Sequence, residues 1–233
     1  KLSPQPEATE AAAWPDPSAL ESIVVLNARP VTRVRNGTFT VETPVWSHLS
    51  RQRAQLERAI DAIGRVQLGD GKVVGTAALV GKALLVTTRS IVETFAVGTG
   101  HDAKLIPQRN AAIDMRAEGG GAPDVHPITR VVLVHPYWDI ALVEAQTLAG
   151  REPLVVETME PPADADVVLI GHPAASEEER DLVSRIYDDV FDVKRLMPGK
   201  YRGREAELSY GRSVSAGSDD AAALSSDGGA ALI

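Results

Sequence analysis

The chain has 233 residues, of which 44% are hydrophobic, and it carries a formal net charge of −8. This length allows one large or two small domains with a sizeable core, and the acidic balance argues against nucleic acid and anionic lipid as partners. Cysteine is absent, which excludes disulfides, a cysteine nucleophile and thiolate metal sites and favours the reducing cytoplasm as location.

The N-terminal third contains three recognisable segments. Residues 1–19 are rich in Pro, Ala and Glu without a sustained period, which predicts a disordered linker. Asn36-Gly37 lies between alternating segments and predicts a β-hairpin near 31–41. Apolar residues at helical spacing then predict a helix over 47–63 with Ser47 as its N-cap.

From residue 64 onward the pattern changes to short, β-branched segments separated by turn residues. No helical stretch of crossover length lies between them, so the sequence predicts a mostly β sandwich or barrel pair rather than a parallel sheet. A charged segment at 173–185 is expected to hold a short helix. The expected strands are GRVQL, KVVGTAALV, ALLVTT, AAIDMRAE, ITRVVLVH, DIALVEA, LVVET, ADVVLIG, DVFDVKRL and AELSYGRS.

Five segments follow one another along the chain: IGRV, VGTAALVGKALLVTTRSIVETFA, HPYWDIALVEA, DVVLIGHPAA and LSSDGGAALI. In this order they resemble the bacterial branch of the trypsin-like serine peptidases. The resemblance covers about 62–233 and implies a trypsin-like double β-barrel with an N-terminal hairpin and helix extension, with the second barrel incomplete at the C-terminus. The implied division is a linker at 1–19, hairpin plus helix at 20–63, a first β-barrel at 64–150 and a second at 151–233.

The resemblance implies a degenerate catalytic triad. Asp139 matches the family's aspartate, whereas Ser90 stands at the general-base histidine and Gly228 at the nucleophilic serine. A serine hydroxyl cannot take up a proton usefully at neutral pH, so the base is missing. A register shifted by one residue would place Asp227 at the nucleophile position, again without an imidazole. The neighbouring oxyanion-region positions are also affected, and they are Ser226, Asp227 and Gly229.

No replacement chemistry is evident in the sequence. His135 and His172 lack a surrounding motif and are expected to serve as structural hydrogen-bonding or packing residues. No metal or phosphate motif is present, so the acidic pairs at 188–189 and 219–220 and the glycines at 119–121 are expected to form solvated turns and a flexible loop. We therefore expect no cofactor and no metal.

The functional expectation is a pseudoprotease: a protein- or peptide-binding sensor or regulatory module of a larger bacterial protein. Its ligand would lie in the cleft between the barrels, with a fused or associated effector domain and strand addition at the open C-terminal edge. Two alternatives remain open. One is an active serine endopeptidase whose site is completed by missing strands or a partner, and the other is a purely structural subunit. No membrane partner is expected, because no apolar run approaches the roughly 20 residues that span a bilayer.

Overall fold

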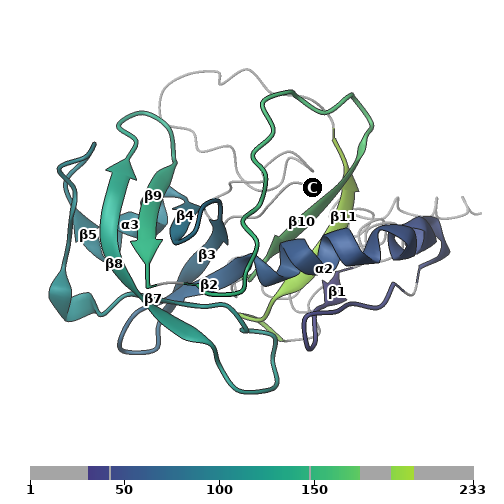
Figure 1. Cartoon of the computed structure of the whole chain (residues 1–233), viewed down its shortest axis with the longest axis horizontal. Coiled ribbons are helices and arrows are strands. Elements are labelled where there is room, and N and C mark those ends of the chain that lie inside the picture. The colour runs from purple at the N-terminus through teal and green to yellow at the C-terminus, as the bar shows by residue number, and fades with distance from the viewer. Residues whose placement is uncertain (1–30, 42, 147, 174–189, 202–233) are drawn as a thin grey trace, which may run out of the picture.

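A closed β-barrel is the central element of the computed structural model, which describes residues 31–41, 43–146, 148–173 and 190–201 (Figure 1). Its six antiparallel strands follow the order β2-β3-β4-β9-β8-β7 around the barrel. The described part of the chain is mostly β, as the sequence predicts. The barrel strands are β2 (Ile63–Gln67), β3 (Val73–Leu79), β4 (Leu84–Thr87), β7 (Ala112–Asp114), β8 (Val125–Val134) and β9 (Ala141–Ala145).

The barrel interior is filled by the alternate residues of its strands. In β9 the buried positions are every second one, and β4 shows the same alternation because neighbouring side chains of a strand point to opposite faces. Gly64 in β2 is required by close packing, since a Cβ there would lie 2.6 Å from Ile113 Cγ1 and from Met115 Sδ. The core residues from the strands include Val66, Leu79, Leu85, Ile113, Val131 and Val143.

One end of the barrel is covered by short elements between β4 and β7. Helix α3 (Arg89–Glu93) follows β4, and the two-stranded sheet of β5 (Ala96–Val97) and β6 (Lys104–Leu105) follows α3. The 3-10 helix η2 (Pro107–Arg109) then leads into β7. Phe95, with no exposed surface, joins these elements to the barrel core.

The tight turn expected at Asn36-Gly37 is confirmed, but the hairpin is only one bridge pair long, because β1 (Thr32–Arg33) pairs with β11 (Arg195–Lys200) instead. Asn36 and Gly37 both adopt positive φ, at 54° and 74°, as the two central residues of a tight hairpin turn require. The backbone groups of Arg35 and Thr38 are hydrogen-bonded to each other in both directions, at 2.9 and 3.1 Å.

The expected helix begins earlier and is divided. A 3-10 helix, η1 (Pro44–Gln52), precedes the α-helix α2 (Arg53–Asp61). Ser47 is therefore not the N-cap; Thr43 holds that position, and Pro44 explains the early start because proline suits the first turn of a helix. Ile63, expected as the last helical residue, is the first residue of β2.

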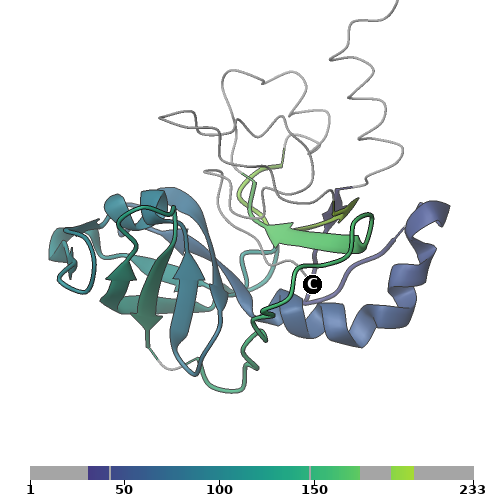
Figure 2. The same ribbon diagram turned by 90° about the horizontal axis from the view of Figure 1, so that it is seen from above.

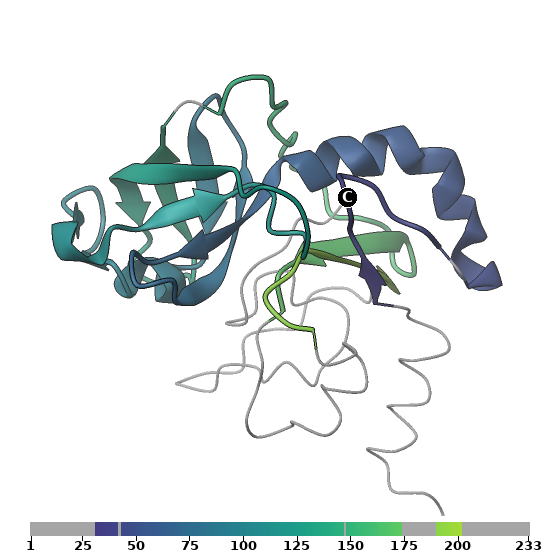
Figure 3. The same cartoon turned by 90° about the horizontal axis from the view of Figure 1, so that it is seen from below.

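A three-stranded antiparallel sheet packs against α2 beside the barrel (Figures 2 and 3). It has the order β1-β11-β10, in which β1 is Thr32–Arg33, β10 is Asp166–Gly171 and β11 is Arg195–Lys200. Strands β10 and β11 lie in the region 151–233 expected to form a second barrel, whereas β1 comes from the segment expected to form the hairpin and pairs with β11. Closure of a second barrel stays a prediction. A second core lies between helix and sheet and contains Trp46, Leu49, Leu56, Ile60, Val168, Ile170 and Leu196.

Two strand expectations differ from the structure. LVVET, at 154–158, is an irregular connection between the barrel and β10, and the side chains of Val155 and Val156 are 84% and 70% exposed. Among the described strands, none pairs with its β-branched residues, so β propensity alone does not make a strand. DVFDVKRL gives a strand only from Arg195 onward. AELSYGRS and 174–185 of the charged segment lie outside the described residues.

Within the described ranges, no helix has both the length and the apolar character needed to cross a membrane.

Candidate functional site

The position of the expected general base lies at the start of a short helix. Strand β4 ends at Thr87, and Thr88 then caps α3, its Oγ1 accepting a hydrogen bond from the Ile91 backbone N–H at 3.4 Å. Ser90 is the second residue of α3 and is half-buried. Its backbone N–H is one of the N-terminal amides that a helix itself cannot pair.

Asp139 supplies the acceptor for Ser90. It lies in the turn between β8 and β9, and its Oδ1 accepts the Ser90 backbone N–H at 2.9 Å. Its Oδ2 lies 3.3 Å from the Ser90 hydroxyl, which donates to it. The structure thus brings together two of the three positions that the sequence resemblance assigns to a triad, and these two are 49 residues apart in the chain.

The donor and the acceptor of each hydroxyl in this contact follow from the charge of the carboxylate. Thr88 Oγ1 lies 2.9 Å from Ser90 Oγ. Because the ionised carboxylate of Asp139 can only accept, Ser90 donates to Asp139 and must accept from Thr88. The Ser90 hydroxyl is therefore engaged on both sides. The arrangement caps a helix, and neither of its two hydroxyls has an imidazole beside it to take up a proton.

The remaining site residues from the sequence are not placed. Gly228, Ser226, Asp227 and Gly229 all lie outside the described residues. Their distance from Ser90 and Asp139 is therefore not part of the described geometry, and the degenerate nucleophile position stays a prediction.

His135 holds the turn that presents Asp139. It follows β8 directly, and its Nδ1 accepts the backbone N–H of Tyr137 at 3.2 Å and of Trp138 at 2.8 Å. The Arg89 guanidinium donates to the Pro136 carbonyl at 3.2 Å from the α3 side. His135 therefore shapes the loop beside Asp139 rather than contacting its carboxylate.

His172 forms an imidazole–hydroxyl pair in the interior. It follows β10, and its Nδ1 lies 3.1 Å from Thr76 Oγ1 in β3, which also accepts the His172 backbone N–H at 3.0 Å. Burial, with the nearby charges of Lys194 and Arg65, holds the pKa of His172 well below its usual value. Both residues of the pair are only 1% exposed, so no substrate can reach the hydroxyl.

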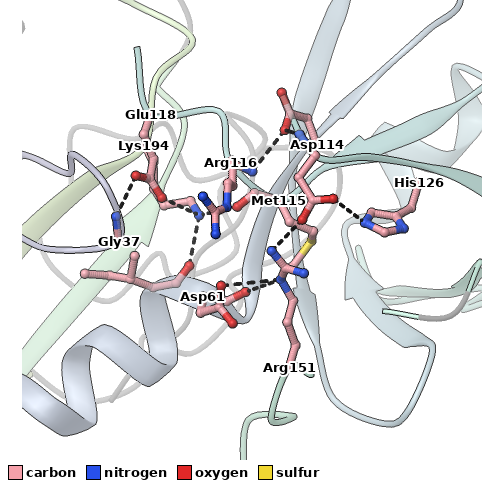
Figure 4. A network of polar contacts seen from close by, with 11 residues as sticks. Gly37, Asp61, Asp114, Met115, Arg116, Glu118, His126, Arg151 and Lys194 are labelled. Carbon is pink, nitrogen blue, oxygen red and sulfur yellow. Dashed lines mark hydrogen bonds and ion pairs between the residues drawn. The ribbon is translucent and has the colours of Figure 1, made fainter. Parts of the chain in front are cut away.

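A larger polar network, centred on Lys194, joins the barrel to the rest of the molecule (Figure 4). The Lys194 ammonium has no exposed surface and donates to the carbonyls of Ile60 and Met115, each at 2.9 Å. It also lies 3.7 Å from Glu118 Oε1. Glu118 in turn accepts the backbone N–H of Gly37 in the hairpin turn at 2.7 Å.

These contacts make Lys194 the meeting point of four segments. Ile60 belongs to α2, Met115 follows β7, Gly37 lies in the hairpin and Lys194 itself directly precedes β11. Burial lowers the pKa of Lys194 to about 8, although the nearby carboxylates of Glu118 and Asp61 act in the opposite direction. A buried ammonium with these partners fixes the relative positions of the segments that it joins.

A second chain of ion pairs extends the network along the barrel. Asp124 contacts Arg151 Nη2 at 2.6 Å and His126 Nε2 at 2.8 Å, and Arg151 Nε donates to the Asp61 carbonyl at 3.1 Å (Figure 4). Partial burial raises the pKa of Asp124, but the charges and hydrogen bonds of Arg151 and His126 outweigh this effect and lower it. No serine or threonine hydroxyl contacts this carboxylate–imidazole pair within the described residues.

Sequence reasoning missed Lys194 because it lies in a segment of mixed polarity with no motif around it, between Val193 and the charged Arg195. The described ranges also contain no group of three His, Asp or Glu side chains that could hold a metal ion.

No protein-family model matches the chain, and no curated protein matches it. Among solved structures, it is similar to the inactive form of the Rv3671c protease, with 15% identity, a TM-score of 0.43 and coverage of 95% of this chain and 79% of that chain. The inactive form of a mutant of Rv3671c from M. tuberculosis H37Rv is 16% identical to the chain and gives a TM-score of 0.45. That match covers 97% of this chain and 82% of that chain. A mutant of human heparin binding protein is 12% identical and gives a TM-score of 0.44, with coverage of 76% of this chain and 75% of that chain. Likenesses this weak establish neither a family nor an activity.

Proposed function

We propose that the chain is a trypsin-like protease homologue without peptidase activity that binds a protein or peptide, as a sensor or regulatory module of a larger bacterial protein. One observation carries the proposal: the Asp139 carboxylate is hydrogen-bonded to the Ser90 backbone N–H and hydroxyl, at 2.9 and 3.3 Å. In a working triad, an imidazole N–H would donate the hydrogen bond that this carboxylate accepts.

The hydroxyl at position 90 can replace the histidine as a donor but not as a base. Catalysis needs a group that takes a proton from the nucleophile and returns it to the leaving amine, and a neutral hydroxyl does neither at neutral pH. Ser90 therefore preserves the local structure that an imidazole–carboxylate pair would otherwise maintain. A retained scaffold with an emptied site is suited to binding without turnover.

The contacts of two histidines support the same proposal. The Nδ1 of His135 is engaged by two backbone amides, and the His172 ring is buried against Thr76. Neither ring contacts an accessible hydroxyl within the described residues. The alternative, an active endopeptidase, would need its base and nucleophile from elsewhere, such as a longer chain or a partner.

The test is a combined labelling and turnover assay. The chain is incubated with a fluorophosphonate probe and with labelled casein, beside the variants Ser90→Ala and Ser90→His and with trypsin as a positive control. We expect no label and no turnover from the native chain or from either variant, because a base alone has no nucleophile to activate. Stoichiometric labelling of the native chain that is lost on changing one serine would overturn the proposal and favour the endopeptidase.

A longer chain distinguishes the two functions further. If the endopeptidase alternative holds, casein turnover should appear in the longer protein or with its partner present. The proposal expects none in either case.

A further inference from the structure

Two consecutive aromatic side chains are exposed in the turn between β8 and β9. Tyr137 is 86% exposed and Trp138 is 57% exposed. Aromatic residues make up only 4% of the chain, and the other described ones are buried or half-buried, with Trp46 and Phe95 at 4% and 0%. Exposed tyrosine and tryptophan are typical of binding surfaces, because they offer a large, rigid contact area.

The backbone that presents these rings is held in place. Besides the two bonds to His135 Nδ1, the His135 backbone N–H donates to the Ile140 carbonyl at 2.9 Å, and the Ile140 N–H donates to the Trp138 carbonyl at 2.8 Å. The His135 and Tyr137 rings meet edge to face, with centroids 6.4 Å apart. A surface that is ordered before binding loses less conformational entropy when a ligand docks.

The next residue, Asp139, adds a carboxylate that forms no ion pair with the described part of the chain. Within the described ranges its carboxylate contacts only the two neutral donors of Ser90. The nearest cation on the facing helix, Arg89, is 3.5 Å from Glu93 and donates to Pro136, so its charge is engaged elsewhere. An ionised carboxylate retains lone pairs for further donors after accepting two hydrogen bonds.

We propose that the turn 135–139 is a docking surface for arginine or lysine side chains in a basic segment of a partner protein. The ring faces of Tyr137 and Trp138 attract a cation through their quadrupoles, and Asp139 provides the opposite charge. The net charge of −8 favours approach of such a segment. The inference rests on the proposed binding function, whose partner it assigns to a chemical class.

The experiment compares two peptides that differ only in charge. The probe is acetyl-Gly-Arg-Arg-Arg-Gly-amide, and its neutral counterpart has citrulline in place of each arginine. Binding to the native chain is followed by heteronuclear NMR, which resolves the tryptophan indole N–H signals. We expect the arginine peptide to bind about tenfold more tightly than the citrulline peptide, to weaken with added salt and to shift the Trp138 signal but not that of buried Trp46.

Variants locate the site. Trp138→Leu and Asp139→Asn should each weaken arginine-peptide binding by about fivefold. Met159→Ala, which changes an 81% exposed side chain in the connection between β9 and β10, is the control and should bind as the native chain does. Circular dichroism confirms that each variant is folded, and Tyr137→Leu replaces any that is not.

Three results would overturn the inference: no binding of the arginine peptide, equal affinity for the two peptides, or binding that the turn variants leave unchanged. Mass spectrometry of the same samples shows whether the peptide probe is cleaved, which distinguishes a failure of the docking surface from a failure of the proposed function. Cleavage of the probe would refute the lack of peptidase activity while leaving the docking surface in place. An intact probe bound away from the turn would refute only the docking surface.

Discussion

Asp139 and Lys194 are both charged groups that join distant segments, but their surroundings differ. Asp139 is half-buried in a surface turn and accepts from two neutral donors. Lys194 has no exposed surface, and two carbonyls and a carboxylate surround it. A partly exposed charge remains free to bind a ligand, whereas a fully buried one is committed to the fold because its partners would be left unpaired without it.

The first way to test this contrast is to remove the buried charge. Lys194→Met keeps most of the side-chain volume but leaves the carbonyls of Ile60 and Met115 and the Glu118 carboxylate without their donor. We expect the free energy of unfolding to fall by about 3–5 kcal/mol. Urea unfolding measures it, with Lys200→Met as the matched control. Lys200 is paired with Asp166 at a half-exposed position, and its loss should cost less than about 1 kcal/mol.

An equal loss in the two lysine variants would contradict the distinction between a buried and an exposed cation.

The second test removes the other charge. Asp139→Ala leaves the Ser90 backbone N–H at the start of α3 without an acceptor. We expect a loss of about 1–3 kcal/mol, smaller than for Lys194 because water can reach this half-exposed turn. The control is Asp70→Ala, which removes a carboxylate that accepts the Lys72 backbone N–H at 2.9 Å in an exposed turn and should change stability little.

If Asp139→Ala destabilises the fold as much as Lys194→Met, the turn is a structural element like the Lys194 network, and its carboxylate is not free for binding.

The third test uses pH to remove the proton from the buried lysine. The pKa of Lys194 is lowered to about 8 in the folded chain, from the ordinary 10.5. Below pH 8 both folded and unfolded chains carry the proton, and the full cost of the buried charge is present. Above pH 8 the folded chain loses the proton first, so stability rises with pH.

The expected gain between pH 8 and pH 9 is about 1 kcal/mol. It is measured as the difference between native and Lys194→Met urea midpoints, because other titrating groups are common to both. A native stability that falls with pH relative to the variant would show that Lys194 is not the group with the lowered pKa.

The contact between Ser90 and Asp139 is the part of the candidate site that sequence reasoning anticipated. A resemblance over segments in the same order assigned both residues to triad positions. In the structure the Ser90 backbone nitrogen lies 2.9 Å from Asp139 Oδ1. The hairpin at Asn36-Gly37 was equally predictable, because positive φ at two successive residues is a local requirement. Both predictions depend on short-range chemistry or on a shared residue order.

The sequence predictions that were wrong or incomplete depend on contacts that local composition does not reveal. LVVET has strand-like composition but lies exposed between the barrel and β10, because a strand needs a neighbouring partner that composition cannot reveal. Ser47 has the chemistry of an N-cap, yet Pro44 starts the helix a turn earlier. The Lys194 network was missed because its members come from four separate segments.

The sequence by itself determined the mostly β character, the hairpin turn, the absence of cysteine chemistry and the identity of the residues at positions 90 and 139, since each follows from local pattern or composition. The tertiary structure decided which polar groups meet: Ser90 with Asp139, His172 with Thr76, and Lys194 with Glu118. Such meetings depend on how β-strands pair and pack over long separations, and burial then decides whether a charge can bind a partner or must hold the fold together.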